Sequence, residues 1–197
     1  YLEFANDGPR GGGPNLDGAD GLAAPILNMA NTPIESIESE QPLMVERYGF
    51  VPNTGGAGKF RGGLGIEREF RLLAEDATFQ LRSDRSDFTP WGVQGGKPGT
   101  PTENYLNPGT DQEEKLPGKT LRQLKKGDLY RVVQAGAGGF GNPLERDMFA
   151  VADDVEQEKL SVDYVRREYG VVINFKNSAL DIPATEKLRA EMQAASV

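Results

Sequence analysis

Glycine is unevenly distributed along this chain, and its distribution constrains the fold more than any other feature. Of the 25 glycines among 197 residues, 24 precede Asn142 and only Gly170 follows it. Sequence rich in glycine and proline favours short strands and turns, whereas a glycine-poor segment can form helices. We therefore predict an α+β fold in two parts. Residues 1–141 form a mainly antiparallel β region with glycine-rich loops, and residues 142–197 form a helical segment with two to three helices and one strand.

The densest glycine cluster, at residues 53–67, lies between two runs of strand-forming residues and carries two cations. The backbone N–H groups of such a loop can converge on an anion without a helix. Lys59, at a flexible loop tip, is easily explained as a solvated cation. Arg61 is followed by Gly62, which lets the backbone close around it, so these two are candidates for binding a substrate or anion. The alternative is a tight connection without a functional role.

Local patterns predict the other elements of the β region. The sequence Asn-Thr-Pro-Ile-Glu resembles a helix start with Thr32 as N-cap, Pro33 at the first helical position and Glu35 completing a capping box. Pro42 ends this helix. Strands are expected at 43–51, 64–73, 77–81, 120–124 and 128–134, with the second and third forming a hairpin, the last two joined by a turn, and 100–118 forming an exposed polar excursion.

Beyond residue 142 the chain has helical patterns, with helices expected at 144–155, 161–169 and 183–194 and a strand at 171–175. Just before them, residues 136–141 match the G-x-G-x-x-G fingerprint of dinucleotide sites. The acidic residue expected after the next strand is replaced by Lys-Asn, and a second helix intervenes. A dinucleotide site is therefore disfavoured.

Two further clusters supply candidate site residues. Asp17 and Asp20 lie in a glycine and aspartate loop, where they could offer carboxylates to a metal or substrate, although Asp-Gly is also common turn chemistry. In the doubled Arg-Ser-Asp triplet, Asp84 or Arg85 could point into a site; the alternative is surface ion pairs of little energetic value. Trp91, the only tryptophan, lies in a second glycine loop that also carries a cation.

The chain contains neither Cys nor His, which excludes Ser-His-Asp triads, thiolate nucleophiles and His-containing zinc sites. We assign no metal ligand within it. The net charge of −8 without a basic stripe disfavours nucleic acid as a partner. No apolar run is long enough to cross a membrane and no export signal is present, so we expect a cytoplasmic protein. Because the chain begins with Tyr1 rather than Met, we also expect a fragment or processed piece of a longer polypeptide.

Several ordered motifs extend over most of residues 10–173. They are Asp17-Gly, Asn31-Thr-Pro-Ile-Glu35, Gly55-Gly-Ala-Gly-Lys-Phe-Arg-Gly-Gly-Leu-Gly65, Asp84-Arg85, Pro90-Trp-Gly, Gly95-Gly-Lys-Pro-Gly99, Lys126-Gly-Asp128, Gly138-Gly-Phe-Gly-Asn-Pro143 and Tyr169-Gly-Val-Val172. In this order they resemble the C-terminal part of the hydantoinase B family, the β subunits of N-methylhydantoinase-type and oxoprolinase-type enzymes. The Asn-Thr-Pro-Ile-Glu and Pro-Trp-Gly forms are closest to the hydantoinase branch.

The resemblance implies a hydrolase that opens a cyclic amide (hydantoin, lactam or oxoproline-like) and uses ATP held by a hydantoinase A-type partner. It also implies a divalent metal in the N-terminal part of the β subunit, outside this chain, which would then be inactive alone. Two alternatives remain open. The chain could be a structural module that packs on the ATP-binding partner without site residues, or part of an ATP-dependent ketone carboxylase of the same superfamily.

Overall fold

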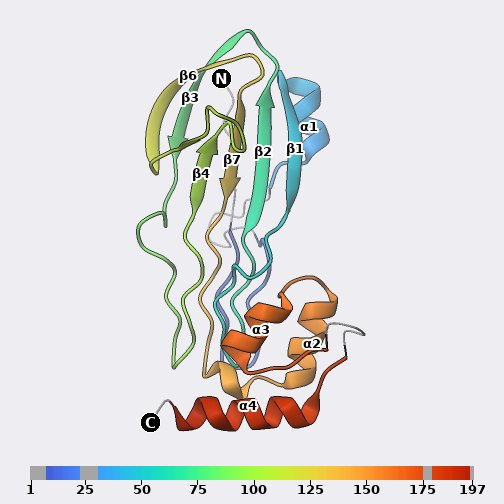
Figure 1. The fold of residues 1–197 in the computed structure, drawn as a ribbon. Coiled ribbons are helices and arrows are strands. Elements are labelled where there is room, and N and C mark those ends of the chain that lie inside the picture. Colours follow the sequence, from blue (N-terminus) through green and yellow to red (C-terminus); the bar gives the residue numbers. More distant parts are fainter. Residues whose placement is uncertain (1–7, 23–30, 175–178, 196–197) are drawn as a thin grey trace.

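The strands lie at one end of the molecule and helices α2, α3 and α4 lie at the other, with long irregular segments between them (Figure 1). This arrangement is that of a computed structural model, which describes residues 8–22, 31–174 and 179–195. The α+β class with antiparallel strands is confirmed. The elements in chain order are α1 (Ile34–Glu40), β1 (Leu43–Phe50), β2 (Ile66–Leu72), β3 (Asp76–Arg82), β4 (Glu103–Leu106), β5 (Glu114–Lys115), β6 (Lys119–Lys125), β7 (Leu129–Val133), the 3-10 helix η1 (Pro143–Glu145), α2 (Met148–Glu156), α3 (Val162–Tyr169) and α4 (Ile182–Ala194).

Within the described residues the strands form two antiparallel sheets. The larger has the order β1-β2-β7-β4-β5, and the smaller pairs β3 with β6. The hairpin expected between β2 and β3 is wrong, because these consecutive strands lie in different sheets. The end of β2 is bound on both sides: Leu72 lies opposite Leu43 of β1, and its N–H donates to the carbonyl of Asp128 beside β7. Side-chain alternation predicts that a strand exists but does not identify its partner.

Residues 100–118 contribute β4 and β5 to the larger sheet. The exposed excursion expected there is confirmed for residues 109–115 and is wrong for residues 102–106. Thr102 and Asn104 are buried despite their polarity. The Asn104 amide accepts a hydrogen bond from the Tyr130 hydroxyl at 2.8 Å and donates one to Ser83 Oγ at 3.3 Å. Buried polar side chains are tolerated when their hydrogen bonds are made, so polar composition was a poor guide to exposure here.

The helix ends agree with the sequence in one case and differ in another. Helix α1 is confirmed, but Pro33 occupies its N-cap position and no side chain caps it, so the capping box with Thr32 is wrong. Helix α3 begins as predicted, with the Ser161 hydroxyl accepting a hydrogen bond from the N–H of Tyr164. It ends at Gly170, which adopts the left-handed conformation with φ of 61°.

The last part of the chain folds back on the helices. The strand predicted at 171–175 is reduced to an isolated bridge between Ile173 and Leu180, and residue 175 lies outside the described residues. Helix α4 is capped by Asp181. The Arg189 guanidinium of α4 donates hydrogen bonds to the carbonyl groups of Tyr169 and Arg146 at 2.9 and 2.8 Å, which anchors this helix to the segment before it.

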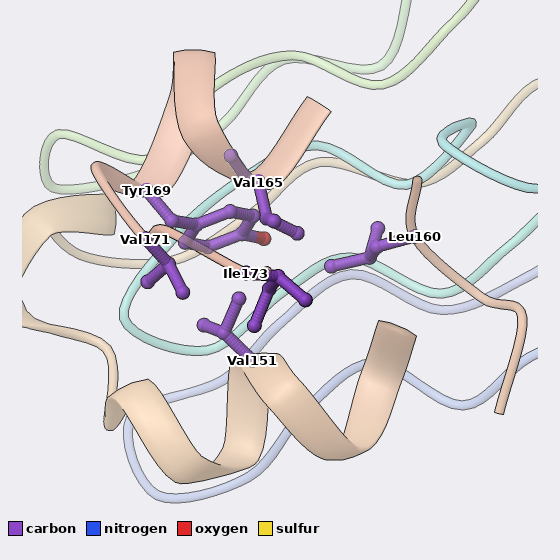
Figure 2. Packing of buried hydrophobic residues seen from close by; sticks show 7 residues of the cluster. Val151, Leu160, Val165, Tyr169, Val171 and Ile173 are labelled. Atoms are coloured by element: carbon purple, nitrogen blue, oxygen red, sulfur yellow. The ribbon is translucent and has the colours of Figure 1, made fainter. Parts of the chain in front are cut away.

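Each end of the molecule has its own hydrophobic core. At the helical end, Val151, Val165 and Val171 are completely buried, and they pack together with Leu160, Tyr169, Ile173 and Ala57 (Figure 2). Ala57 belongs to the glycine cluster, so this core joins the helices to the β region. The second core lies between the two sheets and beneath α1, and it contains Ile37, Phe70, Leu81, Leu116, Tyr130 and Val132. The division at residues 141 and 142 stays a prediction.

Four glycine-rich segments, at residues 8–22, 53–65, 90–99 and 136–141, pack backbone against backbone between these ends. A Cβ atom at Gly136 would lie 1.7 Å from the carbonyl oxygen of Thr54, and one at Gly62 would lie 2.0 Å from that of Ala137. The N–H groups of Gly56 and Gly62 donate to the carbonyl groups of Ala137 and Gly56. Close approach therefore explains the glycine density, and these N–H groups are already occupied.

The match to a dinucleotide fingerprint has the same explanation. Gly136, Gly138 and Gly139 press against the backbone of the neighbouring segments, and the short helix η1 separates this loop from α2. A dinucleotide fingerprint requires a helix that begins directly at the glycine loop. The described fold therefore does not provide the phosphate-binding turn of such a site.

Candidate functional site

Arg61 is buried, and protein acceptors bind its guanidinium. Nη1 and Nη2 donate to the two carboxylate oxygens of Asp20 at 2.7 and 3.1 Å, and Nε donates to Asp154 at 3.1 Å. Nη1 also donates to the carbonyl oxygen of Gly62 at 3.2 Å. Two-point contacts between guanidinium and carboxylate are among the stronger polar interactions in proteins. Arg61 is therefore fixed in one orientation by the chain itself.

Asp154 of α2 connects a second buried arginine to Arg61. One of its oxygens accepts the hydrogen bond from Arg61, and the other accepts one from Nη2 of Arg146 at 2.8 Å. Arg146 in turn makes a two-point contact with Asp17, with an Nη2 to Oδ2 distance of 2.8 Å. We call these five residues, Asp17, Asp20, Arg61, Arg146 and Asp154, the Arg61 network.

The network also fixes the backbone of the glycine cluster. Asp17 accepts a hydrogen bond from the N–H of Arg61 at 2.8 Å, and Asp20 accepts one from the N–H of Leu64 at 2.8 Å. Lys159 lies 3.6 Å from Asp20 and supplies a third cation for the three carboxylates. The charges of the group therefore balance, and a buried charge is tolerated only when it is compensated in this way.

Burial and ion pairing act in opposite directions on these groups. Burial alone would raise the pKa of Asp20, but the Arg61 guanidinium and the Leu64 N–H hold that pKa below its usual value. Burial alone would lower the pKa of Arg61, but the hydrogen bond to Asp20 and the charge of Asp154 raise it. Ion pairing therefore outweighs burial for both Asp20 and Arg61, and each is held in its charged form.

The other predicted site residues lie apart from this network. Asp84, Arg85 and Trp91 are exposed, and the Arg85 guanidinium lies 5.5 Å from the centre of the Trp91 ring. Phe88 and Trp91 are 80% and 71% exposed, which is unusual for large aromatic side chains. We call Arg85, Phe88 and Trp91 the Trp91 surface. The structure thus divides the predicted residues into one group gathered around the buried Arg61 and one exposed group, and their roles in binding stay predictions.

A pocket of about 300 Å³ lies where the two glycine loops meet α3. Its polar lining includes Asn53, Lys97 and Glu168. The hydroxyl of Tyr164, at the same place, donates to the carbonyl oxygen of Gly55 at 3.0 Å, and burial raises its pKa to about 12. A neutral phenol, one ammonium group and one carboxylate can bind a small polar molecule, but they do not form a nucleophile and base pair.

The sequence did not reveal Asp154 or Arg146 as partners of Arg61. One signal was available: Asp154 lies three residues after the buried Val151, so helical spacing places it on the buried face of α2. A carboxylate on a buried helix face needs a cation. Nothing in the sequence identified which cation it would be.

The described residues do not fit the divalent metal that the family resemblance implies. No group of three or more Asp or Glu side chains in the described ranges could hold a metal ion. The three carboxylates that do cluster are each bound by arginine.

Among the helices of the described residues, none is both long and apolar enough to cross a membrane.

The fold and these glycine segments define the class of protein: the chain belongs to the hydantoinase B/oxoprolinase family, whose model matches residues 1–143. A relative in Pseudomonas sp. strain NS671, named as the putative B component of a D-/L-hydantoinase, is 35% identical over 96% of this chain and 32% of its own length. The chain therefore spans about a third of the length of this relative.

Two solved structures have the same fold. The ATP-dependent caprolactamase of Pseudomonas jessenii superimposes with a TM-score of 0.80 at 28% identity, over 94% of this chain and 33% of that one. Nucleotide-free acetone carboxylase superimposes with a TM-score of 0.85 at 24% identity, over 97% of this chain and 30% of that one. At this lower identity the likeness concerns the fold alone.

Proposed function

We propose that this chain is part of the β subunit of an ATP-dependent amidohydrolase that opens a cyclic amide, such as a hydantoin, a lactam or an oxoproline-like ring. The observation that carries the proposal is the family match over residues 1–143. The similar proteins named as a hydantoinase component and an ATP-dependent caprolactamase support the same reaction class. Since the chain spans about a third of their length, the rest of the polypeptide would complete the site.

The chemistry requires activation of an unreactive group. An amide carbonyl is a poor electrophile, and transfer of phosphate to its oxygen creates a leaving group, so that water can attack the carbon. We propose that ATP for this step is held by a hydantoinase A-type partner and that the assembly is cytoplasmic. A divalent metal held outside the described residues would activate the attacking water.

Within this chain, the two groups of charged residues would have different roles. The Arg61 network would position the glycine segments, because the charges of Arg61 and Arg146 are already compensated by aspartates. On the Trp91 surface, Arg85 has no carboxylate partner among the ion pairs of the described residues. Arg85 is therefore the candidate for contact with an anionic intermediate.

A second candidate function is an interaction module that packs on the ATP-binding partner without site residues. The observation that favours it is the exposure of Phe88 and Trp91, since large aromatic side chains are enriched at protein interfaces. Under this alternative, Arg85 would support assembly and not turnover.

The two functions are separated by Arg85→Ala in the assembled enzyme. A site role is supported if turnover falls while the complex still assembles, and unchanged turnover with intact assembly rejects it. Arg82→Ala is the matched control, because Arg82 is the first residue of the same repeated triplet and is also exposed. Assembly is measured by analytical size-exclusion chromatography.

The reaction class is tested directly with the purified assembly. Ring opening of hydantoin, caprolactam and 5-oxoproline is assayed beside carboxylation of acetone, each with and without ATP. The proposal expects ATP-dependent opening of at least one ring. Carboxylation of acetone without ring opening would support the ketone carboxylase alternative and reject the amidohydrolase.

A further inference from the structure

Arg68, in the middle of β2, is a buried cation with no hydrogen-bond partner among the described residues. Its side chain is 1% exposed, and none of Nε, Nη1 and Nη2 has an acceptor in that part of the chain. Its described polar contact is with the ring of Tyr48 on β1, whose centre lies 4.1 Å from the guanidinium carbon. An aromatic ring compensates a cation only in part, so the charge of Arg68 remains largely uncompensated.

The neighbours of Arg68 cannot supply the missing charge. Paired residues of an antiparallel sheet project to the same face, which places Tyr48 and Val132 beside Arg68. Along β2, Ile66 and Phe70 share this face, which belongs to the buried side of the sheet. These residues are aromatic or aliphatic, and Asn104, which lies opposite Val132 on the same face, is polar but uncharged, so no described strand residue on this face neutralises the guanidinium.

The opposite face of β2 has a different pattern. Glu67 and Glu69 each lie within 4 Å of both Arg47 and Arg131. Arg71 pairs with Glu46. Every other charged residue of β2 therefore has a partner, and Arg68 is the exception on this strand.

A buried charge without a partner is strongly disfavoured, and buried guanidinium groups in proteins are paired. Water could satisfy the five N–H groups but would not neutralise the charge. A planar carboxylate matches the fork of N–H donors and carries the one negative charge that is needed. A phosphate dianion would leave excess negative charge, because β1, β2, β4 and β7 place no second cation on this face.

We propose that Arg68 binds a carboxylate, which completes an ion pair in the interior of the larger sheet. The carboxylate comes either from a protein side chain that is not part of residues 1–197 or from a small-molecule anion. Either source supplies a carboxylate group to the guanidinium. The two are distinguished by whether a carboxylate added to the solution stabilises the protein. The inference does not depend on the proposed reaction.

The test compares the thermal unfolding of the full-length protein in its assembly with that of Arg68→Met, after dialysis into chloride. Acetate at matched ionic strength is the probe. Met retains much of the apolar stem of Arg68 and removes the charge. The control is Arg131→Met, on the adjacent strand and the opposite face, where the lost arginine is an ion-paired one. Circular dichroism confirms that each variant is folded.

Two outcomes support the proposal and identify the source. If a small molecule binds, acetate stabilises the wild type and Arg131→Met saturably, whereas the stability of Arg68→Met does not change. At an acetate concentration 100 times the dissociation constant, the folding equilibrium constant is expected to rise by about 100-fold. If a protein carboxylate binds, acetate has no effect, and Arg68→Met lowers the unfolding temperature because a buried carboxylate loses its partner.

One outcome overturns the proposal. If Arg68→Met is as stable as the wild type, or more stable, at every acetate concentration, Arg68 has no anionic partner and only water satisfies it. Removal of an unpaired buried charge is expected to stabilise a protein. The sign of the change in unfolding temperature therefore decides the question.

Discussion

The Asp154 carboxylate accepts a hydrogen bond from Nε of Arg61 at 3.1 Å, although the two residues are 93 positions apart in the sequence. This contact joins α2 to the glycine cluster, and both side chains are buried. The same carboxylate binds Arg146. Asp154 therefore holds two buried cations in place and connects the helical segment to the glycine segments.

We expect Asp154→Asn to lower the free energy of unfolding by about 3–5 kcal/mol, because it leaves two buried guanidinium groups without part of their compensating charge. Urea unfolding followed by circular dichroism measures the change. Asp153→Asn, at the exposed neighbouring position of α2, is the control and is expected to change stability by less than about 0.5 kcal/mol. Equal effects at the two positions would contradict a structural role for the network.

The depressed pKa of Asp20 predicts how stability depends on pH. Its folded pKa lies below the unfolded value of 3.8, so the folded state binds the proton more weakly than the unfolded state does. The stability that this carboxylate contributes is therefore fully present well above pH 3.8 and is lost as pH falls through the lower, folded pKa. Denaturant unfolding of the wild type and of Asp20→Asn is measured between about pH 7 and about pH 2.5. The difference between their free energies of unfolding should shrink in this acid range. A constant difference over the whole range would mean that the ionised carboxylate is not what stabilises the fold.

The close contact between the glycine segments predicts that a single added methyl group destabilises the fold. Gly136→Ala would place a methyl group 1.7 Å from the Thr54 carbonyl oxygen, and the atoms it meets are backbone atoms that cannot move aside. We expect the segments to separate and the unfolding temperature to fall by at least about 10 °C, as for loss of several kcal/mol in a domain of this size.

Gly49→Ala is the matched control for this prediction. Gly49 lies on β1, and apart from its chain neighbours no atom of the described residues lies within 4 Å of the position that its Cβ would take. Differential scanning calorimetry is expected to find this variant as stable as the wild type, or slightly more stable, because alanine reduces the entropy of the unfolded chain. If Gly136→Ala behaves like Gly49→Ala, glycine is not required for close approach.

Much of the fold could be predicted from the sequence, because local signals determine local structure. The helix predicted at 161–169 matches α3 to within one residue, and the strands predicted at 64–73 and 128–134 contain β2 and β7. Strand partners depend on contacts that no local pattern contains. For this reason the chain order predicted a hairpin of β2 with β3, whereas β3 pairs with β6.

The candidate site could be predicted only in part, for a related reason. The sequence indicated Arg61 and the loop with Asp17 and Asp20 as separate candidates, and the structure brings the three residues together. Their partners Arg146 and Asp154 come from a helical segment far along the sequence. Residue types alone do not distinguish a guanidinium that is available to bind an anionic ligand from one that is already paired with aspartates of the same chain.

Asn104 provides the last prediction, because it explains how a polar segment can lie inside the larger sheet. Its side chain is 1% exposed, and its Oδ1 accepts a hydrogen bond from the Tyr130 hydroxyl at 2.8 Å. Tyr130→Phe removes the donor and keeps the ring, so the buried acceptor loses its partner at a cost of about 1–3 kcal/mol. Tyr105→Phe, on β4 itself and only half-buried, is the control and should have little effect on urea unfolding. If the two variants are equally stable, the hydrogen bond does not stabilise the sheet, and the backbone pairing of β4 with β7 is enough to hold the polar segment in place.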